Sequence, residues 1–172
     1  GDGGDQTYGG PMTVGTGVTF DAGGGTGAAA GTAGTITHNG AVTFGASASY
    51  VGNTTFNSSV TLTEALALDV DGLLTLSAVA GAGFDLSLEV QNLELTGMFT
   101  NVPNLTIIGY DDNEDIGLGD AFGGTFVSDI DIDSAEIVFM DNSGSGITTL
   151  ILGNASWTGH AAIATSEIIP FN

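Results

Sequence analysis

Residues 34–77 read GTITHNGAVTFGASASYVGNTTFNSSVTLTEALALDVDGLLTLS. The stretch is rich in Thr, Val and aromatic residues, which favour strands, and Asn and Gly interrupt it at short intervals. Apolar and polar residues alternate within its short segments, and that period belongs to a strand. Only residues 64–68 (EALAL) suggest a helix, and five residues are too few to form one alone. The stretch therefore predicts short strands joined by turns.

The same pattern extends over most of the chain, so we predict an all-β fold. Residues 84–90 alternate apolar side chains with Asp85, Ser87 and Glu89, as a half-buried strand does. The Asn39-Gly40 pair is the strongest hairpin or turn signal in the chain. The predicted strands are 35–38, 41–44, 49–51, 54–56, 60–62, 66–70, 73–76, 84–90, 93–95, 105–108, 125–132, 136–140, 147–152 and 155–158.

Short motifs recur at a spacing that suggests stacked repeats. The sequence Val42-Thr43-Phe44 returns 18 residues later as Val60-Thr61-Leu62, and Leu74 matches Leu93 after 19 residues. Repetition at this length is typical of rungs that stack on one another. We therefore favour a parallel β-solenoid. A β-sandwich (jelly-roll) filament subunit is the alternative, because the chain keeps no strict rung length.

The chain divides into an N-terminal segment and one larger unit. Residues 1–20 begin polar and Gly-rich and then alternate from Met12 to Phe20, which predicts an N-terminal arm able to act as a donor strand. Residues 21–172 are predicted to form a single β-rich domain. Within it, residues 23–34 (GGGTGAAAGTAG) are expected to form a loop of small residues.

The charge balance is unusual, with 20 acidic residues, no Lys or Arg, and a net charge of −20. Without basic side chains the chain cannot neutralise phosphate, so nucleic acid and anionic membrane surfaces are excluded as direct partners. The compact state must instead be supported by metal cations, salt or a basic partner, because like charges repel. The absence of Cys excludes disulfides and thiol catalysis.

The chain's beginning and its apolar runs bear on where the protein acts. It begins at Gly1 rather than Met, and we expect that a secretory signal has been removed and that the protein is extracellular or on the cell surface. No apolar run approaches the roughly 20 residues of a membrane helix, so no membrane span is expected.

Over about residues 35–160 the chain resembles filamentous-haemagglutinin-like and autotransporter-type bacterial surface β-repeat proteins. The stretch quoted above carries most of this resemblance, and IGLGDAFGGTFVSDIDIDSAEIVF (residues 116–139) is similar in style. The resemblance implies a parallel β-solenoid and a role at the cell surface.

Two acidic segments are candidate calcium sites. In residues 111–117 oxygen ligands alternate at Asp111, Asn113 and Asp115 before a Gly, which is reminiscent of a calcium loop, and Asp120 follows. Residues 129–133 form a strand pattern that places Asp129, Asp131 and Asp133 on one face, roughly 6.5–7 Å apart. A divalent ion could bridge such like charges. The alternatives are a solvated acidic turn and the solvent face of an amphipathic strand.

Other reactive groups are few, and we expect no enzyme activity. We interpret His38 and His160 as surface or turn residues, because no Ser/His/Asp spacing, phosphate loop or HExxH motif accompanies them. Four sequons are candidate glycosylation sites in a secreted chain, at Asn53, Asn57, Asn104 and Asn154.

We therefore expect a structural subunit of an extracellular assembly, such as a filament, sheath or surface layer. Its partners would be copies of itself, held by β-strand pairing and supported by calcium. The alternative is a calcium-dependent cell-surface adhesin or carbohydrate-binding module, whose partners would be glycans or other cell-surface molecules.

Overall fold

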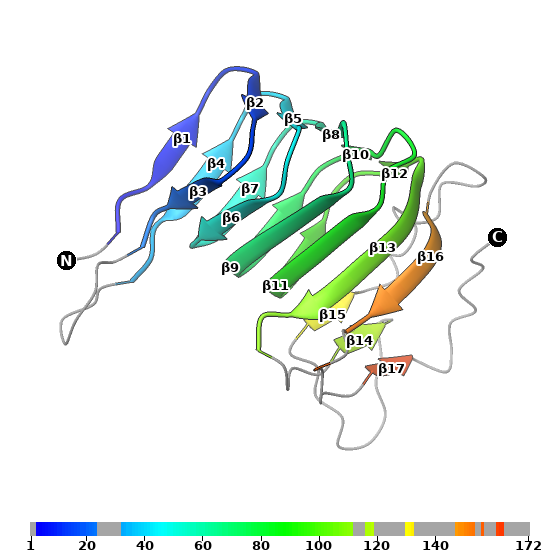
Figure 1. Ribbon diagram of the computed structural model, residues 1–172. Coiled ribbons are helices and arrows are strands. Elements are labelled where there is room, and N and C mark those ends of the chain that lie inside the picture. The colour runs from blue at the N-terminus through cyan, green and yellow to red at the C-terminus, as the bar shows by residue number, and fades with distance from the viewer. Residues whose placement is uncertain are drawn as a thin grey trace.

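The computed structural model describes residues 3–23, 32–111, 116–118, 130–132, 147–153, 156 and 161–163. All regular structure in these residues is β-strand, and every strand pair among them is parallel. Parallel pairing at a regular sequence offset confirms the predicted all-β parallel β-solenoid (Figure 1). The sandwich alternative is wrong, because a jelly-roll is built from antiparallel strands.

Five successive rungs form the body of the solenoid. The first contains β1 (Gln6–Tyr8), β2 (Met12–Val14) and β3 (Val18–Asp21), and the second contains β4 (Thr35–His38), β5 (Val42–Phe44) and β6 (Ala48–Val51). The third contains β7 (Asn53–Phe56), β8 (Val60–Leu62) and the start of β9 (Leu66–Leu76). The fourth contains the end of β9, β10 (Val79–Ala80) and the start of β11 (Leu86–Leu95). The fifth contains the end of β11, β12 (Phe99–Thr100) and β13 (Val102–Gly109), and β16 (Ile147–Leu152) stacks on β13.

The strands of each rung lie on three faces. The first face carries β1, β4, β7 and the second halves of β9 and β11, and the second face carries β2, β5, β8, β10 and β12. The third face carries β3, β6, the first halves of β9 and β11, then β13 and β16. The first and third faces belong to one sheet that folds at a corner.

The register explains the repeats in the sequence. Val42 pairs with Val60 and Leu74 pairs with Leu93, so the spacings of 18 and 19 residues are successive rungs. The step from the first rung to the second is longer, because Gln6 pairs with Ile36. In the sequence, the small-residue segment 23–34 separates β3 from β4, and its residues 24–31, predicted to be part of a loop, lie outside the described residues.

Glycine forms the corner between the first and third faces. Gly52 (φ 119°) separates β6 from β7, and Gly72 (φ 151°) bends the continuous strand β9, where the sequence predicts two separate strands. A Cβ on Gly72 would lie 2.8 Å from Oδ1 of Asn53 in the rung before it. A larger residue therefore cannot occupy this corner without displacing its neighbour.

Stacking between successive rungs determines the backbone conformation at two other places, Asn39-Gly40 and residues 64–68. Asn39-Gly40 forms a corner and not a hairpin, because the flanking strands β4 and β5 lie in different sheets. Residues 64–68 do not form a helical turn, since β9 begins at Leu66 and pairs with β11. In both cases the partner one rung away determines the conformation.

A small second sheet lies at the C-terminal end of the solenoid. It contains β14 (Ile116–Leu118), β15 (Ile130–Ile132) and β17 (Ala161–Ile163), all parallel. Figure 1 shows these strands close to β13 and β16, and β15 contacts β11. Ile116, Ile130 and Ile132 are fully buried and belong to the same hydrophobic core as the rungs.

The predicted N-terminal arm contains the strands of the first rung. Residues 6–21 pair in register with β4, β5 and β6 of the same chain. That this segment also acts as a donor strand between chains, and that residues 21–172 form a single domain, stay predictions.

Candidate functional site

Among the described residues, the first rung is the outermost layer near the N-terminus (Figure 1), and its backbone pairs on one side within them. In a parallel ladder the N–H and C=O of one residue point to the same neighbouring strand, and those of the next residue point away. In β2 the N–H of Met12 donates to Ala41 O (3.0 Å), and Val14 O accepts from the N–H of Gly45 (2.9 Å). Thr13, which lies between them, therefore directs both of its backbone groups to the open side.

The other two strands of the rung follow the same alternation. Ala22, just after β3, donates its N–H to Val51 O (3.0 Å) and accepts at its C=O from Gly34 (2.7 Å), so both groups face the second rung. Counting back along β3 places the backbone groups of Thr19 on the open side, and the same alternation in β1 does so for Thr7. No strand in the described part of the chain covers this edge.

The interior of the solenoid is partly exposed at the same end. Three inward-facing side chains of the first rung, Tyr8, Met12 and Val18, are only partly buried against the core. The second-rung residues that pair with them are His38 (1% exposed), Val42 (1%) and Ala48 (4%). The difference arises because a further rung covers the second layer and none in the described residues covers the first. Within the described residues, this end therefore has three partly exposed apolar side chains beside unpaired strand edges, although Val14 (2% exposed) and Phe20 (8%) of the same rung are buried.

The opposite end differs. Inward-facing residues of the fifth rung are buried: Leu95 (3% exposed), Phe99 (0%) and Ile107 (0%). The small sheet of β14, β15 and β17 adds fully buried isoleucines to the core there. Among the described residues, the partly buried apolar side chains at this end are Leu150 and Leu152 of β16, and the ladders end on β12 and β16.

An aromatic cluster lies directly beneath the open end. His38 stacks between Tyr8 (ring centroids 4.9 Å apart) and Phe56 (4.7 Å), while Tyr50 stacks on Phe20 (4.7 Å). Both ring nitrogens of His38 and the hydroxyl of Tyr50 are buried without a hydrogen-bond partner. Burial lowers the pKa of His38 from 6.5 to about 4, so the ring is neutral at pH 7. Burial, with a smaller contribution from Tyr8, raises the pKa of Tyr50.

The interpretation of His38 as a surface or turn residue is therefore wrong. The sequence contained the signal, since Ile36 and His38 stand two apart on β4 and must share the inward face. With no acid or hydroxyl bonded to it, the ring has no partner for proton transfer. His38 is a packing residue, and its burial leaves both ring nitrogens without hydrogen-bond partners.

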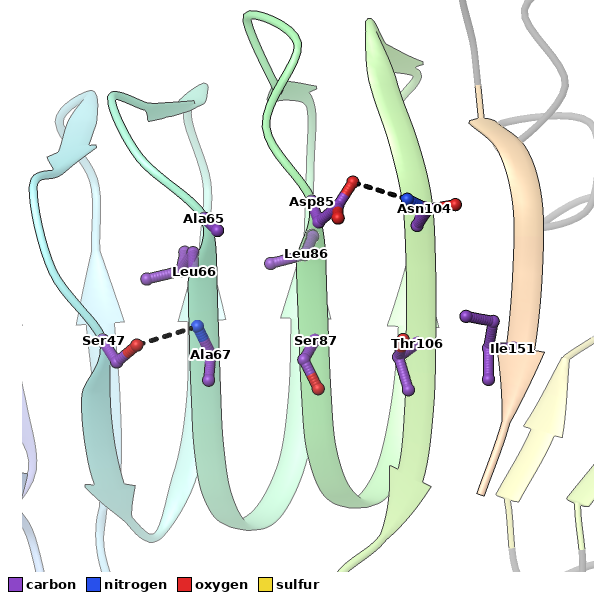
Figure 2. A pocket seen from close by; sticks show the side chains of 10 residues that line it. All are labelled: Ser47, Ala65, Leu66, Ala67, Asp85, Leu86, Ser87, Asn104, Thr106 and Ile151. Atoms are coloured by element: carbon purple, nitrogen blue, oxygen red, sulfur yellow. Dashed lines mark hydrogen bonds between the residues drawn. The ribbon is translucent and has the colours of Figure 1, made fainter. Parts of the chain in front are cut away.

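A shallow groove crosses the strands of the third face (Figure 2). Its volume is about 430 Å³, and a smaller hollow of about 250 Å³ continues it towards the first rung. Small side chains form its floor, among them Ala67, Ser87 and Thr106, which are register partners on β9, β11 and β13. Its polar groups bond one another: Ser47 Oγ accepts from the N–H of Ala67 (3.0 Å). The hydroxyl-bearing side chains of Ser87 and Thr106 also line the groove.

Acidic side chains gather beside the groove on the same face. Partial burial, followed by the carboxylates of Asp71, Asp69, Glu89 and Asp111, raises the pKa of Tyr110. Asp69 accepts a hydrogen bond from Ser49 Oγ (3.2 Å), and Asp71 accepts one from Gln91 Nε2 (2.8 Å). Within the described ranges, no three His, Asp or Glu side chains lie close enough together to hold a metal ion.

The predicted calcium ligands fall mostly beyond the described residues. Asp111 is exposed just after β13, and Asp131 lies in β15, where it pairs with Gly117. The remaining candidates lie outside the described residues: Asn113, Asp115, Asp120, Asp129 and Asp133. Calcium binding therefore stays a prediction.

The described sequon asparagines link successive rungs. Asn53 Oδ1 accepts from the N–H of Leu73 (2.9 Å), and Asn57 Nδ2 donates to Oδ1 of Asn39 (2.9 Å). The third, Asn104, donates from Nδ2 to Oδ1 of Asp85 (2.8 Å), as Figure 2 shows. Asn154 lies outside the described residues, and glycosylation stays a prediction at all four positions.

Sequence reasoning missed the open end itself. The recurrence of Thr7, Thr13 and Thr19 at intervals of six returns in the second rung as Thr37, Thr43 and Ser49, so it does not distinguish the first rung from the next. Within the described residues, no helix has the length and hydropathy needed to cross a membrane.

No protein-family model, curated protein or solved structure matches this chain.

Proposed function

We propose that the chain is a structural subunit of an extracellular assembly, joined to other copies by β-strand pairing. The observation that supports this role is the first rung, whose outer strand edges no strand in the described part of the chain covers, beside the partly exposed side chains of Tyr8, Met12 and Val18. An unpaired strand edge is a template for another strand. The role is mechanical and requires no catalytic group.

Few of the usual devices that prevent such pairing are present in the first rung, where Pro11 directly precedes β2. Natural edge strands carry Pro, Lys or a bulge, or are covered by another element. Here β1, β2 and β3 contain no Pro, the whole chain contains no Lys, and their pairing with the second rung shows no register shift. Pairing with another chain would satisfy the backbone groups of the edge and remove apolar surface from water.

The net charge of −20 opposes association, so cations belong to the proposal. Calcium would reduce the repulsion between copies, bound by acidic side chains of the kind found in residues 111–115 and 129–133. An extracellular location supplies both calcium and salt. At low ionic strength the repulsion between acidic side chains would impede assembly, and extracellular salt and calcium screen that repulsion.

The test is to measure the mass of the purified chain by analytical ultracentrifugation over a wide concentration range, with calcium or with a chelator. We expect assemblies that grow with concentration and that calcium strengthens, and electron microscopy would show their form. A chain that stays monomeric at every concentration in both conditions would contradict the proposed function.

A further inference from the structure

We propose that the groove of the third face binds an uncharged polysaccharide, whose chain lies along the solenoid axis and hydrogen-bonds through its hydroxyl groups. This site goes beyond the structural role proposed above, because it uses side chains on a face of the solenoid and not the edges of strands. Three features of the groove favour this ligand: its hydroxyl and amide lining, its length, and the sign of its charge.

Four polar side chains form the centre of the groove. Ser87 of β11 is the register partner of Thr106 of β13, and two residues earlier Asp85 accepts a hydrogen bond from Asn104 (2.8 Å), as Figure 2 shows. Adjacent strands lie about 4.8 Å apart, and alternate residues of one strand lie roughly 6.5–7 Å apart. The four side chains therefore stand at the corners of a rectangle on one face, close enough to contact a single bound sugar unit.

These side chains keep unused hydrogen-bonding groups. The hydroxyls of Ser87 and Thr106 make no hydrogen bond within the described residues. Asn104 uses its Nδ2 on Oδ1 of Asp85, so Asn104 Oδ1 and Asp85 Oδ2 stay available as acceptors. Ser47 Oγ accepts from the N–H of Ala67 and retains its own hydrogen to donate. A sugar hydroxyl both donates and accepts, so it suits a groove that offers both kinds of group.

The groove is long, which favours a chain over a single small molecule. Its main part reaches from Ser47, beside β6, to Ile151 of β16, and the smaller hollow continues it from Ser47 and Ala67 to Thr19 of β3. Together they cross six stacked strands, which corresponds to about 24 Å at the usual strand spacing. A small-molecule site normally encloses most of its ligand, whereas this groove is shallow and open along its length.

The rungs repeat similar chemistry along this length. Ser47, Ala67, Ser87 and Thr106 occupy the same outward position on successive strands, so small or hydroxyl-bearing side chains recur at every step. Repeated sugar units of one chain would therefore meet repeated partners. The exposed side chain of Ala67 forms a flat floor over which such a chain passes.

The charge of the groove excludes anionic sugars. Asp85 lines the main part and Asp69 lines the hollow, while the chain contains no Lys or Arg. Uronic acids and sulfated sugars would be repelled, because no cation is present to offset their charge. The main part contains one carboxylate against three hydroxyls and one amide. This lining favours a hydroxyl ligand over an ammonium group, which donates hydrogen bonds but accepts none.

The test measures binding of uncharged hexasaccharides by isothermal titration calorimetry. The probes are cellohexaose, laminarihexaose and maltohexaose, with hexagalacturonate as the anionic probe and hexalysine as the cationic one. The double variant Ser87→Ala, Thr106→Val removes two groove hydroxyls. We expect at least one uncharged probe to bind, and this variant to weaken that binding roughly tenfold, because two hydrogen bonds are lost. Hexagalacturonate should not bind.

The matched control is the double variant Thr37→Val, Thr55→Val. These threonines are also outward register partners on successive strands, but they lie on the first face. The control should bind the sugar like the unsubstituted chain, and far-UV circular dichroism would confirm that both variants fold. Ala67→Phe provides a second test, since its ring would fill the groove from an exposed position and should abolish binding.

Three results would overturn the proposal. They are an unsubstituted chain that binds none of the uncharged hexasaccharides, sugar binding that both groove variants leave unchanged, and binding of hexalysine alone, which would identify a basic peptide as the ligand. Equal losses in the groove variants and the control would place the sugar elsewhere and overturn it too. Assembly is measured separately by ultracentrifugation, so a chain that assembles but binds no sugar leaves the proposed structural role intact.

Discussion

His38 illustrates how a single residue can limit the stability of this fold. Its ring continues the aromatic stack between Tyr8 and Phe56, so its shape suits the site. Its two nitrogens, however, are buried without partners. Leaving a buried polar group unsatisfied costs about 1–3 kcal/mol. The residue therefore packs well and is electrostatically unfavourable.

Replacing His38 with Phe should raise stability and remove a dependence on pH. In the unfolded chain the ring titrates near 6.5 and in the fold near 4, so the unfolded state binds more protons between these values. Stability from this residue is present above pH 6.5 and is lost as pH falls towards 4, by about 3 kcal/mol in total. We expect the urea midpoint of His38→Phe to fall less between pH 7 and pH 4.5 than that of the unsubstituted chain.

His160 is the control, since it is the other histidine of the chain. Carboxylates titrate in all of these proteins and cancel in the comparison. If His160→Phe rather than His38→Phe removed the pH dependence, the assignment to His38 would be wrong.

At the scale of elements, the corners between faces are as decisive as the strands. Strand β9 passes from the third face to the first without interruption, and it bends at Gly72. The next rung bends at a register shift between Val90 and Asn92 in β11. Side-chain bonds between rungs then hold the corner, since Asn53 accepts from the N–H of Leu73.

Gly72→Ala should destabilise the chain by about 1–3 kcal/mol, because φ there is 151° and the new Cβ would lie 2.8 Å from Asn53 Oδ1. A urea titration with an unchanged m-value would measure this. Gly15→Ala is the matched control, as nothing lies within 4 Å of a Cβ at that position. Equal midpoints for the two variants would show that the corner tolerates a side chain.

At the scale of the whole molecule, the burial of apolar side chains between stacked rungs stabilises the fold, and repulsion between uncompensated acidic charges destabilises it. The core runs through all five rungs and into the small C-terminal sheet. The chain carries a net charge of −20 and no Lys or Arg, so no basic side chain can form an ion pair with its acids. The surface repulsion must be screened from outside, and its range is about 30 Å at 0.01 M salt but about 3 Å at 1 M.

Raising sodium chloride from 0.01 M to 1 M should therefore increase Tm. A gain of about 1 kcal/mol corresponds to roughly 2–4 °C for a chain of this size. Differential scanning calorimetry would measure it at fixed pH and protein concentration. Calcium chloride at equal ionic strength separates the causes, since any additional gain reports bound calcium. A Tm that is independent of salt would contradict the electrostatic argument.

The strands that could be predicted were those whose pattern is local. Residues 35–38 and 147–152 form strands with the predicted bounds, because both are rich in the β-branched residues Ile and Thr, which favour strands. The rung spacing was also predictable, since Val42 and Val60 occupy equivalent inward positions. By contrast, the continuity of β9 and the corner at Asn39-Gly40 depend on strands one rung away.

The candidate site was less accessible to prediction. The calcium ligands were predicted within residues 111–133, most of which lie outside the described part of the chain. The open end was missed because the sequence of the first rung resembles that of any other rung. Thr13 and Thr43 occupy the same position in successive rungs, and they differ in having a neighbour on one side or on both.

By itself, the sequence determined the all-β class, the spacing of the rungs and the absence of compensating positive charge. These properties follow from side-chain chemistry and from a periodicity of two. The tertiary structure was needed to choose the parallel β-solenoid over the sandwich, to show that His38 is enclosed among aromatic rings, and to show that no strand among the described residues pairs with the outer side of the first rung. The physical reason is that burial and backbone pairing arise between residues about 20 positions apart, and their outcome depends on what stacks above and below each rung.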